Sequence, residues 1–318
     1  MIGAYSKAPL WFLFFLIAMG LGYATLNRYD PRDVPGLYDA KAYCAMVMNQ
    51  SLQEDQRDLG HRILVPYLAR PVYWLAKGRL HSWNPAFFAL LTVNAFFTAW
   101  TALLIVLVGR SVAGQRIGLI GALLFLVNFA TVNLNLAGYV DSAVTCMLMA
   151  MAWAMLSNRW WVLPFAATLG ATAKETFVPM AIIMAFTWWL LDRGTLKLIW
   201  ITAMALASVS AMVLVMVPET PAAFVSSRQA AGAGFFYLGG LWRCLTAREF
   251  LFTFLWLAPL ALGSLRRLPR PWVMASFTAG ASALVMGAYD DALGNAARAV
   301  FSAVGPVLSL AAALTLAD

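Results

Sequence analysis

The chain has 318 residues, of which 62% are hydrophobic and only 11% are charged. A water-soluble domain carries an apolar fraction nearer half, so this composition excludes a soluble globule and predicts a polytopic membrane protein. The formal net charge of +8 does not indicate a nucleic-acid partner, because the lysines and arginines stand singly between apolar runs. We expect these basic residues to set the orientation of the chain in the membrane.

Ten apolar runs approach the ~20 residues that an α-helix needs to cross a hydrocarbon core of ~30 Å. They are separated by short turns and two longer loops, and no internal repeat divides them. The pattern predicts an all-α polytopic membrane protein, with about ten transmembrane helices in a single domain that comprises residues 1–318. In chain order the predicted spans are Pro9–Leu26, Asn84–Val108, Ile117–Leu136, Tyr139–Leu156, Trp160–Ala173, Phe177–Leu191, Leu198–Val217, Phe250–Leu265, Trp272–Tyr289 and Ala299–Ala317.

The first span follows Lys7, and this lysine belongs to the more basic side of the chain. Cytoplasmic loops carry an excess of lysine and arginine, so we expect both termini in the cytoplasm, in a multi-pass protein of the bacterial inner membrane. All the acidic residues except Asp192 and Asp318, and both histidines, then fall on the exoplasmic or periplasmic face. The basic residues of the predicted cytoplasmic connections are Arg110, Arg116, Arg159, Arg193, Lys197, Arg266, Arg267 and Arg270.

Two long loops are expected on the exoplasmic face, residues 27–83 and 218–249. Apolar residues recur at helical spacing in two stretches of the first loop, which predicts two amphipathic helices along the outer surface. A charged turn separates these stretches. The segment Ile63–Ala76 is apolar but contains two prolines and Arg70, so we interpret it as an interfacial helix and not as a further span.

Three acidic residues are candidates for a catalytic base. Asp39 stands near the start of the first predicted surface helix, where a carboxylate could face the bundle and accept a proton. A favourable interaction with the helix dipole would also explain this position. Asp30 precedes a proline in a turn-like stretch, so solvation explains it equally well. Asp141 lies at the outer end of the fourth predicted span and could instead be a helix cap.

The triplet Lys174-Glu175-Thr176 joins two unusually short predicted spans. Helices this short cannot both cross the membrane upright, so their shared turn should lie below the outer surface. Charges at that depth must be paired or hydrated, and interrupted helices often mark a membrane binding site. We therefore expect a cavity open to the outside, with Lys174 and Glu175 as substrate-binding candidates. In the alternative interpretation, Lys174 extends toward water with Glu175 as its local partner.

The remaining site candidates are basic or aromatic. Arg298 lies at the mouth of the last span, where its guanidinium could bind a phosphate or anchor the helix at the interface. Arg62 introduces the second surface helix, next to His61, for which a structural role is the simpler interpretation. Tyr43, in the first surface helix, is also a candidate for substrate binding.

The three cysteines form no paired motif, although Cys44 and Cys244 could form a disulfide. No HExxH sequence, acid triad or Cys/His cluster predicts a metal site. We expect neither a metal nor another cofactor.

The order of these features resembles the GT-C superfamily of integral membrane glycosyltransferases. The resemblance rests on a first span followed by Asp39-Ala40-Lys41-Ala42-Tyr43, then Arg62-Ile63-Leu64-Val65-Pro66, then Lys174-Glu175-Thr176. It implies a GT-C-like bundle that transfers a sugar from a polyprenyl-phosphate donor to a glycan, lipid or protein acceptor on the exoplasmic face. It also makes Asp39 the base, and Arg62, Lys174 and Arg298 candidates for the lipid phosphate. Many members open this loop with two adjacent acids and carry a soluble C-terminal domain, whereas the candidate acids Asp30 and Asp39 of this chain each stand singly.

The residue inventory is compatible with this chemistry, because sugar transfer from a lipid phosphate needs a base for the acceptor hydroxyl and cations for the departing phosphate. A one-step displacement would invert the anomeric centre. The main alternative is a transporter or flippase of a lipid-linked sugar or small solute, which would also bury charges in a helix bundle. Inverted repeats and mid-span ionisable residues, typical of transporters, are not evident. A third interpretation is a noncatalytic scaffold, or an acyl or phospholipid transferase.

Overall fold

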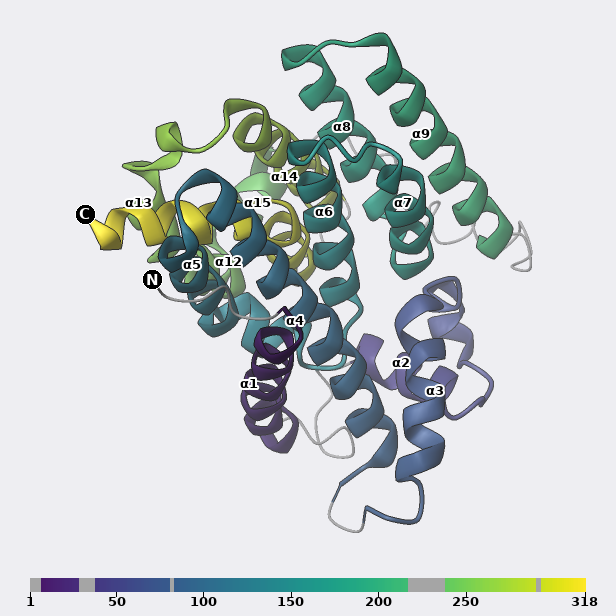
Figure 1. Ribbon diagram of the computed structural model, residues 1–318. Coiled ribbons are helices and arrows are strands. Elements are labelled where there is room, and N and C mark those ends of the chain that lie inside the picture. Colours follow the sequence, from purple (N-terminus) through teal and green to yellow (C-terminus); the bar gives the residue numbers. More distant parts are fainter. Residues whose placement is uncertain (1–6, 29–37, 81–82, 217–237, 290–292) are drawn as a thin grey trace.

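The computed structural model describes residues 7–28, 38–80, 83–216, 238–289 and 293–318, and these ranges contain helices but no β-strand. The all-α expectation is therefore confirmed for the described residues (Figure 1). The elements are α1 (Lys7–Arg28), α2 (Tyr38–Val47), a 3₁₀ turn (Glu54–Leu59), α3 (Leu64–Ala76), α4 (Pro85–Val112), α5 (Gln115–Val127), a π-helical turn (Thr131–Asn135), α6 (Asp141–Leu156), α7 (Val162–Ala173), α8 (Phe177–Leu191), α9 (Thr195–Met216), α11 (Leu238–Thr246), α12 (Arg248–Phe254), α13 (Leu257–Leu262), a second 3₁₀ turn (Leu265–Arg267), α14 (Arg270–Tyr289) and α15 (Leu293–Ala317).

Five described helices are long and apolar enough to cross a membrane, namely α1, α4, α9, α14 and α15. Residues Gly240–Thr246 and Arg248–Leu262 form a pair bent by 55°, which makes a sixth candidate if the pair is one broken span. The helices α5, α6, α7 and α8 are apolar but shorter. These long apolar helices are consistent with an integral membrane protein, whereas the count of about ten spans stays a prediction.

Two of the predicted spans are not continuous helices. Ile117–Leu136 is interrupted after Val127, because Asn128 adopts an extended backbone and its Oδ1 accepts a hydrogen bond from the amide of Ala130. Such a local side-chain bond competes with the helical ladder. The second interrupted span is Phe250–Leu265, which is broken where α12 ends at Phe254. The Nδ2 of Asn128 donates to the carbonyl of Thr253, next to this break. A hydrogen bond therefore links the two helix interruptions.

The interior of the bundle is built on α4 and α15, whose apolar stretches are mostly buried, whereas α1 and α9 are mostly exposed. α5 packs against both central helices. The close approach of α4 and α5 depends on glycine, because a methyl group on Gly109 would overlap the backbone of Gly118. Small residues of this kind let helix backbones touch in membrane proteins.

The first loop contains the two predicted helices, α2 and α3, which lie beside one end of α4 (Figure 1). α3 packs against α4 with its small and aromatic face, and the opposite face leaves Trp74 and Leu75 exposed. The side chain of Lys77 lies over the Trp74 ring at 5.2 Å. An apolar outer face flanked by basic residues is typical of interfacial helices. The position of α3 at a membrane surface stays a prediction.

Candidate functional site

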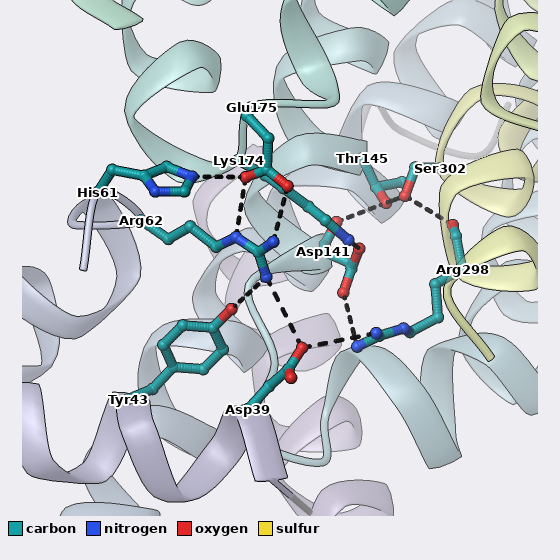
Figure 2. A network of polar contacts seen from close by, with 10 residues as sticks. All are labelled: Asp39, Tyr43, His61, Arg62, Asp141, Thr145, Lys174, Glu175, Arg298 and Ser302. Atoms are coloured by element: carbon teal, nitrogen blue, oxygen red, sulfur yellow. Dashed lines mark hydrogen bonds and ion pairs between the residues drawn. The ribbon is translucent and has the colours of Figure 1, made fainter. Parts of the chain in front are cut away.

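Eight titratable candidates from distant parts of the sequence meet in one cluster (Figure 2). Most of them stand at a helix end or beside one, while Tyr43 lies within α2 and Arg298 in the second turn of α15, so that α2, α3, α6, α7, α8 and α15 converge on the same place. The antiparallel order of these helices brings the start of α6, the end of α7 and the start of α15 to one end of the bundle. The members are Asp39, Tyr43, His61, Arg62, Asp141, Lys174, Glu175 and Arg298.

Glu175 is the most heavily hydrogen-bonded acid of the cluster. Nε and Nη2 of Arg62 donate to its two oxygens at 2.9 and 2.7 Å, and Nε2 of His61 lies 2.8 Å from Oε2. Bidentate arginine–carboxylate pairs of this kind fix geometry as well as charge. Glu175 lies in the turn between α7 and α8. Burial alone would raise the pKa of its carboxyl, but the Arg62 charge and the two hydrogen-bond donors outweigh burial and hold the pKa well below its usual range.

Tyr43 joins α2 to the same arginine. Nη1 of Arg62 donates to the Tyr43 hydroxyl oxygen at 2.9 Å. Burial raises the pKa of this phenol, so Tyr43 is neutral at physiological pH and acts as a hydrogen-bond acceptor. Arg62 is thus held from two sides, by α2 through Tyr43 and by the turn between α7 and α8 through Glu175.

Lys174 and Asp141 form a buried ion pair at 2.8 Å, with side chains that are 4% and 2% exposed. Buried charges are stable only when they are paired and hydrogen-bonded. The alternative in which Glu175 is the local partner of Lys174 is therefore wrong, because the neighbouring carboxylate turns to Arg62 instead. The ammonium group of Lys174 is therefore bound by a carboxylate of the protein itself.

Arg298 is the second guanidinium of the cluster. Its Nη1 lies 3.3 Å from Oδ2 of Asp141, and its Nη2 lies 3.7 Å from Oδ2 of Asp39. The guanidinium carbon also lies 4.0 Å from the centre of the Tyr139 ring, a stacking contact that arginine favours. Only 7% of the Arg298 side chain is exposed, so these contacts fix it inside the bundle.

Two hydroxyl groups behind Asp141 and Arg298 were missed by sequence reasoning. Oγ1 of Thr145 lies 3.0 Å from the Ser302 hydroxyl, which donates in turn to the carbonyl of Arg298 at 3.0 Å. Thr145 follows Asp141 by four positions, and Ser302 follows Arg298 by four. That spacing puts each hydroxyl on the same helix face as the charged residue before it, and it is the signal that could have found them.

Asp39 is the acid with the longest contacts. Its Oδ2 lies 3.7 Å from Nη1 of Arg62 and 3.7 Å from Nη2 of Arg298. Both distances are ion-pair contacts and too long for hydrogen bonds. Within the described ranges, no hydrogen bond reaches this carboxylate, and its side chain is 21% exposed. Asp39 therefore lies between two fixed cations without being fixed by either.

The other candidates are less closely tied to this cluster. Asp30 lies outside the described residues. No disulfide joins any two of Cys44, Cys146 and Cys244, all of which lie in the described ranges, so the pairing considered for Cys44 and Cys244 is absent. Among the residues that the structure describes, no group of three His, Cys, Asp or Glu side chains is arranged to hold a metal ion.

Comparison of the chain with protein-family models, with curated proteins and with solved structures found no match.

Proposed function

We propose that the chain is an inverting membrane glycosyltransferase of the GT-C type, with Asp39 as the general base. The observation that carries this proposal is the position of the Asp39 carboxylate, which faces two guanidinium groups without a hydrogen bond to either. A base has to be free to accept a proton, and the departing phosphate needs cations already in place. Asp39 would be the base, and Arg62 and Arg298 beside it would be the cations for the phosphate.

In the proposed reaction, the acceptor hydroxyl loses its proton to Asp39 while its oxygen bonds to the anomeric carbon of the sugar. The bond between that carbon and the phosphate oxygen breaks, and the lipid phosphate departs with the bonding electrons. Arg298 and Arg62 stabilise the negative charge that grows on the leaving oxygen. Attack and departure on opposite sides of the anomeric carbon invert its configuration.

The other cluster members then have supporting roles. Glu175 and Tyr43 orient Arg62 by accepting its hydrogen bonds, and His61 supports Glu175. Asp141 orients Arg298, and Lys174 balances the charge of Asp141. Preorganisation of this kind removes the cost of moving charged groups during the reaction.

The remaining features of the proposal concern the partners and the setting. The donor is a polyprenyl-phosphate sugar, and the acceptor is a glycan, lipid or protein of the cell envelope. About ten transmembrane helices place both termini in the cytoplasm and the charged cluster on the periplasmic side of a bacterial inner membrane. No cofactor or nucleic acid takes part.

The test is transfer activity of the purified full chain in lipid vesicles with a panel of polyprenyl-phosphate sugars. We expect turnover of one donor, and a loss of about 10² to 10⁴ in rate for Asp39→Asn, the usual contribution of a general base. Asp58→Asn makes the same chemical change at an exposed position of the same loop and is expected to retain full activity. Full activity of Asp39→Asn would remove the base assignment. Solute uptake into the vesicles without any donor would favour a transporter instead.

A further inference from the structure

The guanidinium groups of Arg62 and Arg298 converge on a single atom. Nη1 of Arg62 and Nη2 of Arg298 each lie 3.7 Å from the same oxygen, Oδ2 of Asp39 (Figure 2). The two nitrogens are therefore no more than twice that distance apart. This separation is small enough for one phosphate group to contact both nitrogens through different oxygens, at ordinary hydrogen-bond lengths of ~2.8 Å. We call these two facing nitrogens the two-arginine site.

The contacts inside the cluster show which acid an incoming anion can displace from the arginines most easily. Glu175 accepts two short hydrogen bonds from Arg62, and Asp141 accepts one at 2.8 Å from Lys174. Asp39 contacts its cations only at 3.7 Å. A buried guanidinium needs an anion close by. Displacing Asp39 breaks no hydrogen bond to either arginine, and it leaves Glu175 beside Arg62 and Asp141 beside Arg298.

We infer that Asp39 is the resting counter-ion of the two-arginine site, and that the phosphate group of the lipid donor displaces it from Arg62 and Arg298. The inference rests on the proposed function and adds an order of events to it. An incoming phosphate and the Asp39 carboxylate compete for the same two cations, because two anions cannot share them without repulsion. After displacement the carboxylate has no guanidinium partner and is available to an acceptor hydroxyl.

This arrangement links the base to the presence of the donor. Without a phosphate in the two-arginine site, Asp39 is engaged with two cations. With a phosphate in place, the same carboxylate is released beside the sugar that will react. No covalent bond changes in the exchange, which replaces one anion with another.

The competition can be measured by binding, without turnover. The probe is a short-chain polyprenyl monophosphate without a sugar, titrated into the full-length protein in detergent micelles. Asp39→Asn removes the competing charge while keeping the size of the side chain, so we expect it to bind the probe roughly tenfold more tightly than the unmodified protein, equivalent to ~1.4 kcal/mol. The uncharged polyprenol of equal length should bind both proteins equally. Equal or weaker binding of the phosphate probe by Asp39→Asn would overturn the inference.

A double-variant cycle shows whether the gain arises at the two-arginine site. In an Arg298→Gln background, Asp39→Asn should tighten phosphate binding less, because one of the two cations for which the anions compete is absent. An undiminished gain in that background would also overturn the inference. Melting temperatures of all variants show whether each protein is folded. Asp58→Asn and Arg270→Gln, two substitutions at separate exposed positions, serve as matched controls and should leave the affinity for the phosphate probe unchanged.

The two proposals fail in different ways. Tighter phosphate binding by Asp39→Asn, together with no sugar transfer from any donor, would support the competition and remove the glycosyltransferase. Sugar transfer that depends on Asp39, together with unchanged phosphate affinity in Asp39→Asn, would support the glycosyltransferase and remove the competition.

Discussion

Lys174 and Asp141 are 33 positions apart in the sequence, and their side chains meet at 2.8 Å in the interior of the protein. Arg298 approaches the other oxygen of the same carboxylate at 3.3 Å. Asp141 therefore connects the start of α6 to the end of α7 and to α15. The position of Arg298 depends on this acid, and so does the two-arginine site.

Substitution of the two partners should have unequal effects on stability. Asp141→Asn removes the acid that is hydrogen-bonded to Lys174 and takes one acid from Arg298, so we expect a loss of about 3–5 kcal/mol, the usual cost of breaking a buried pair. Lys174→Met should cost less, because Asp141 keeps Arg298 as a partner. Thermal unfolding in detergent measures both. Asp192→Asn breaks an exposed ion pair with Lys197 and should cost under ~1 kcal/mol. A larger loss for Lys174→Met than for Asp141→Asn would contradict the arrangement.

The contribution of Glu175 to stability should depend on pH. Its pKa in the folded protein is lowered, so its contacts stabilise the fold above the usual carboxyl pKa of ~4.3 and lose this effect as the pH falls through and below that value. We expect Glu175→Gln to melt at a lower temperature than the unmodified protein at pH 7. The difference should shrink progressively below about pH 4.5. Melting curves across this range test it, with Asp58→Asn, at an exposed position of the first loop, as the control. A gap that stays constant would refute the prediction.

Arg62→Lys should loosen the first loop although it keeps the positive charge. Lysine cannot reproduce the two parallel bonds to Glu175 together with the bond to Tyr43. We expect faster amide hydrogen exchange in α2 and at the start of α3, measured by mass spectrometry in detergent. Arg57→Lys, at an exposed position of the same loop, should leave the exchange unchanged. Equal protection in both variants would show that Arg62 is not what holds the loop to the bundle.

Gly170→Ala should disturb the turn that carries Lys174 and Glu175. A methyl group at Gly170 would overlap the fully buried ring of Phe177, the first residue of α8. Overpacking of this kind typically costs about 1–3 kcal/mol. We expect a lower melting temperature and lower affinity for the phosphate probe. Gly20→Ala, on α1 with open space around it, should be neutral or slightly stabilising. Unchanged melting of Gly170→Ala would mean that the Phe177 ring moves aside freely.

The positions of the helices were predictable from the sequence because long apolar runs mark the segments that are removed from water. Local interruptions were harder to predict. Asn128 stops α5 through a hydrogen bond to its own neighbourhood, in a stretch whose average hydropathy is that of a continuous span. A window that averages hydropathy does not contain that information.

The residues of the charged cluster were also predictable as candidates, because isolated charges in an apolar chain are costly and few. Their pairing was not predictable. The sequence puts Lys174 next to Glu175, but the end of α7 directs the lysine to Asp141 and the following residue toward Arg62. Adjacent residues outside a helix point in different directions, so partner choice depends on which other helix ends lie nearby. Tertiary structure alone supplies that information.

The cluster takes one of its cations from α15, which is synthesised after every other described helix. Until Arg298 has left the ribosome, the described part of the chain offers Lys174 as the paired cation of Asp141 and Arg62 as that of Asp39. Assembly of the polar interior therefore has to wait until α15 has been synthesised, with these charges kept hydrated or shielded by the insertion machinery. A chain that stops before α15 would present an unbalanced carboxylate at the membrane, a feature by which quality-control proteases could recognise an unfinished copy.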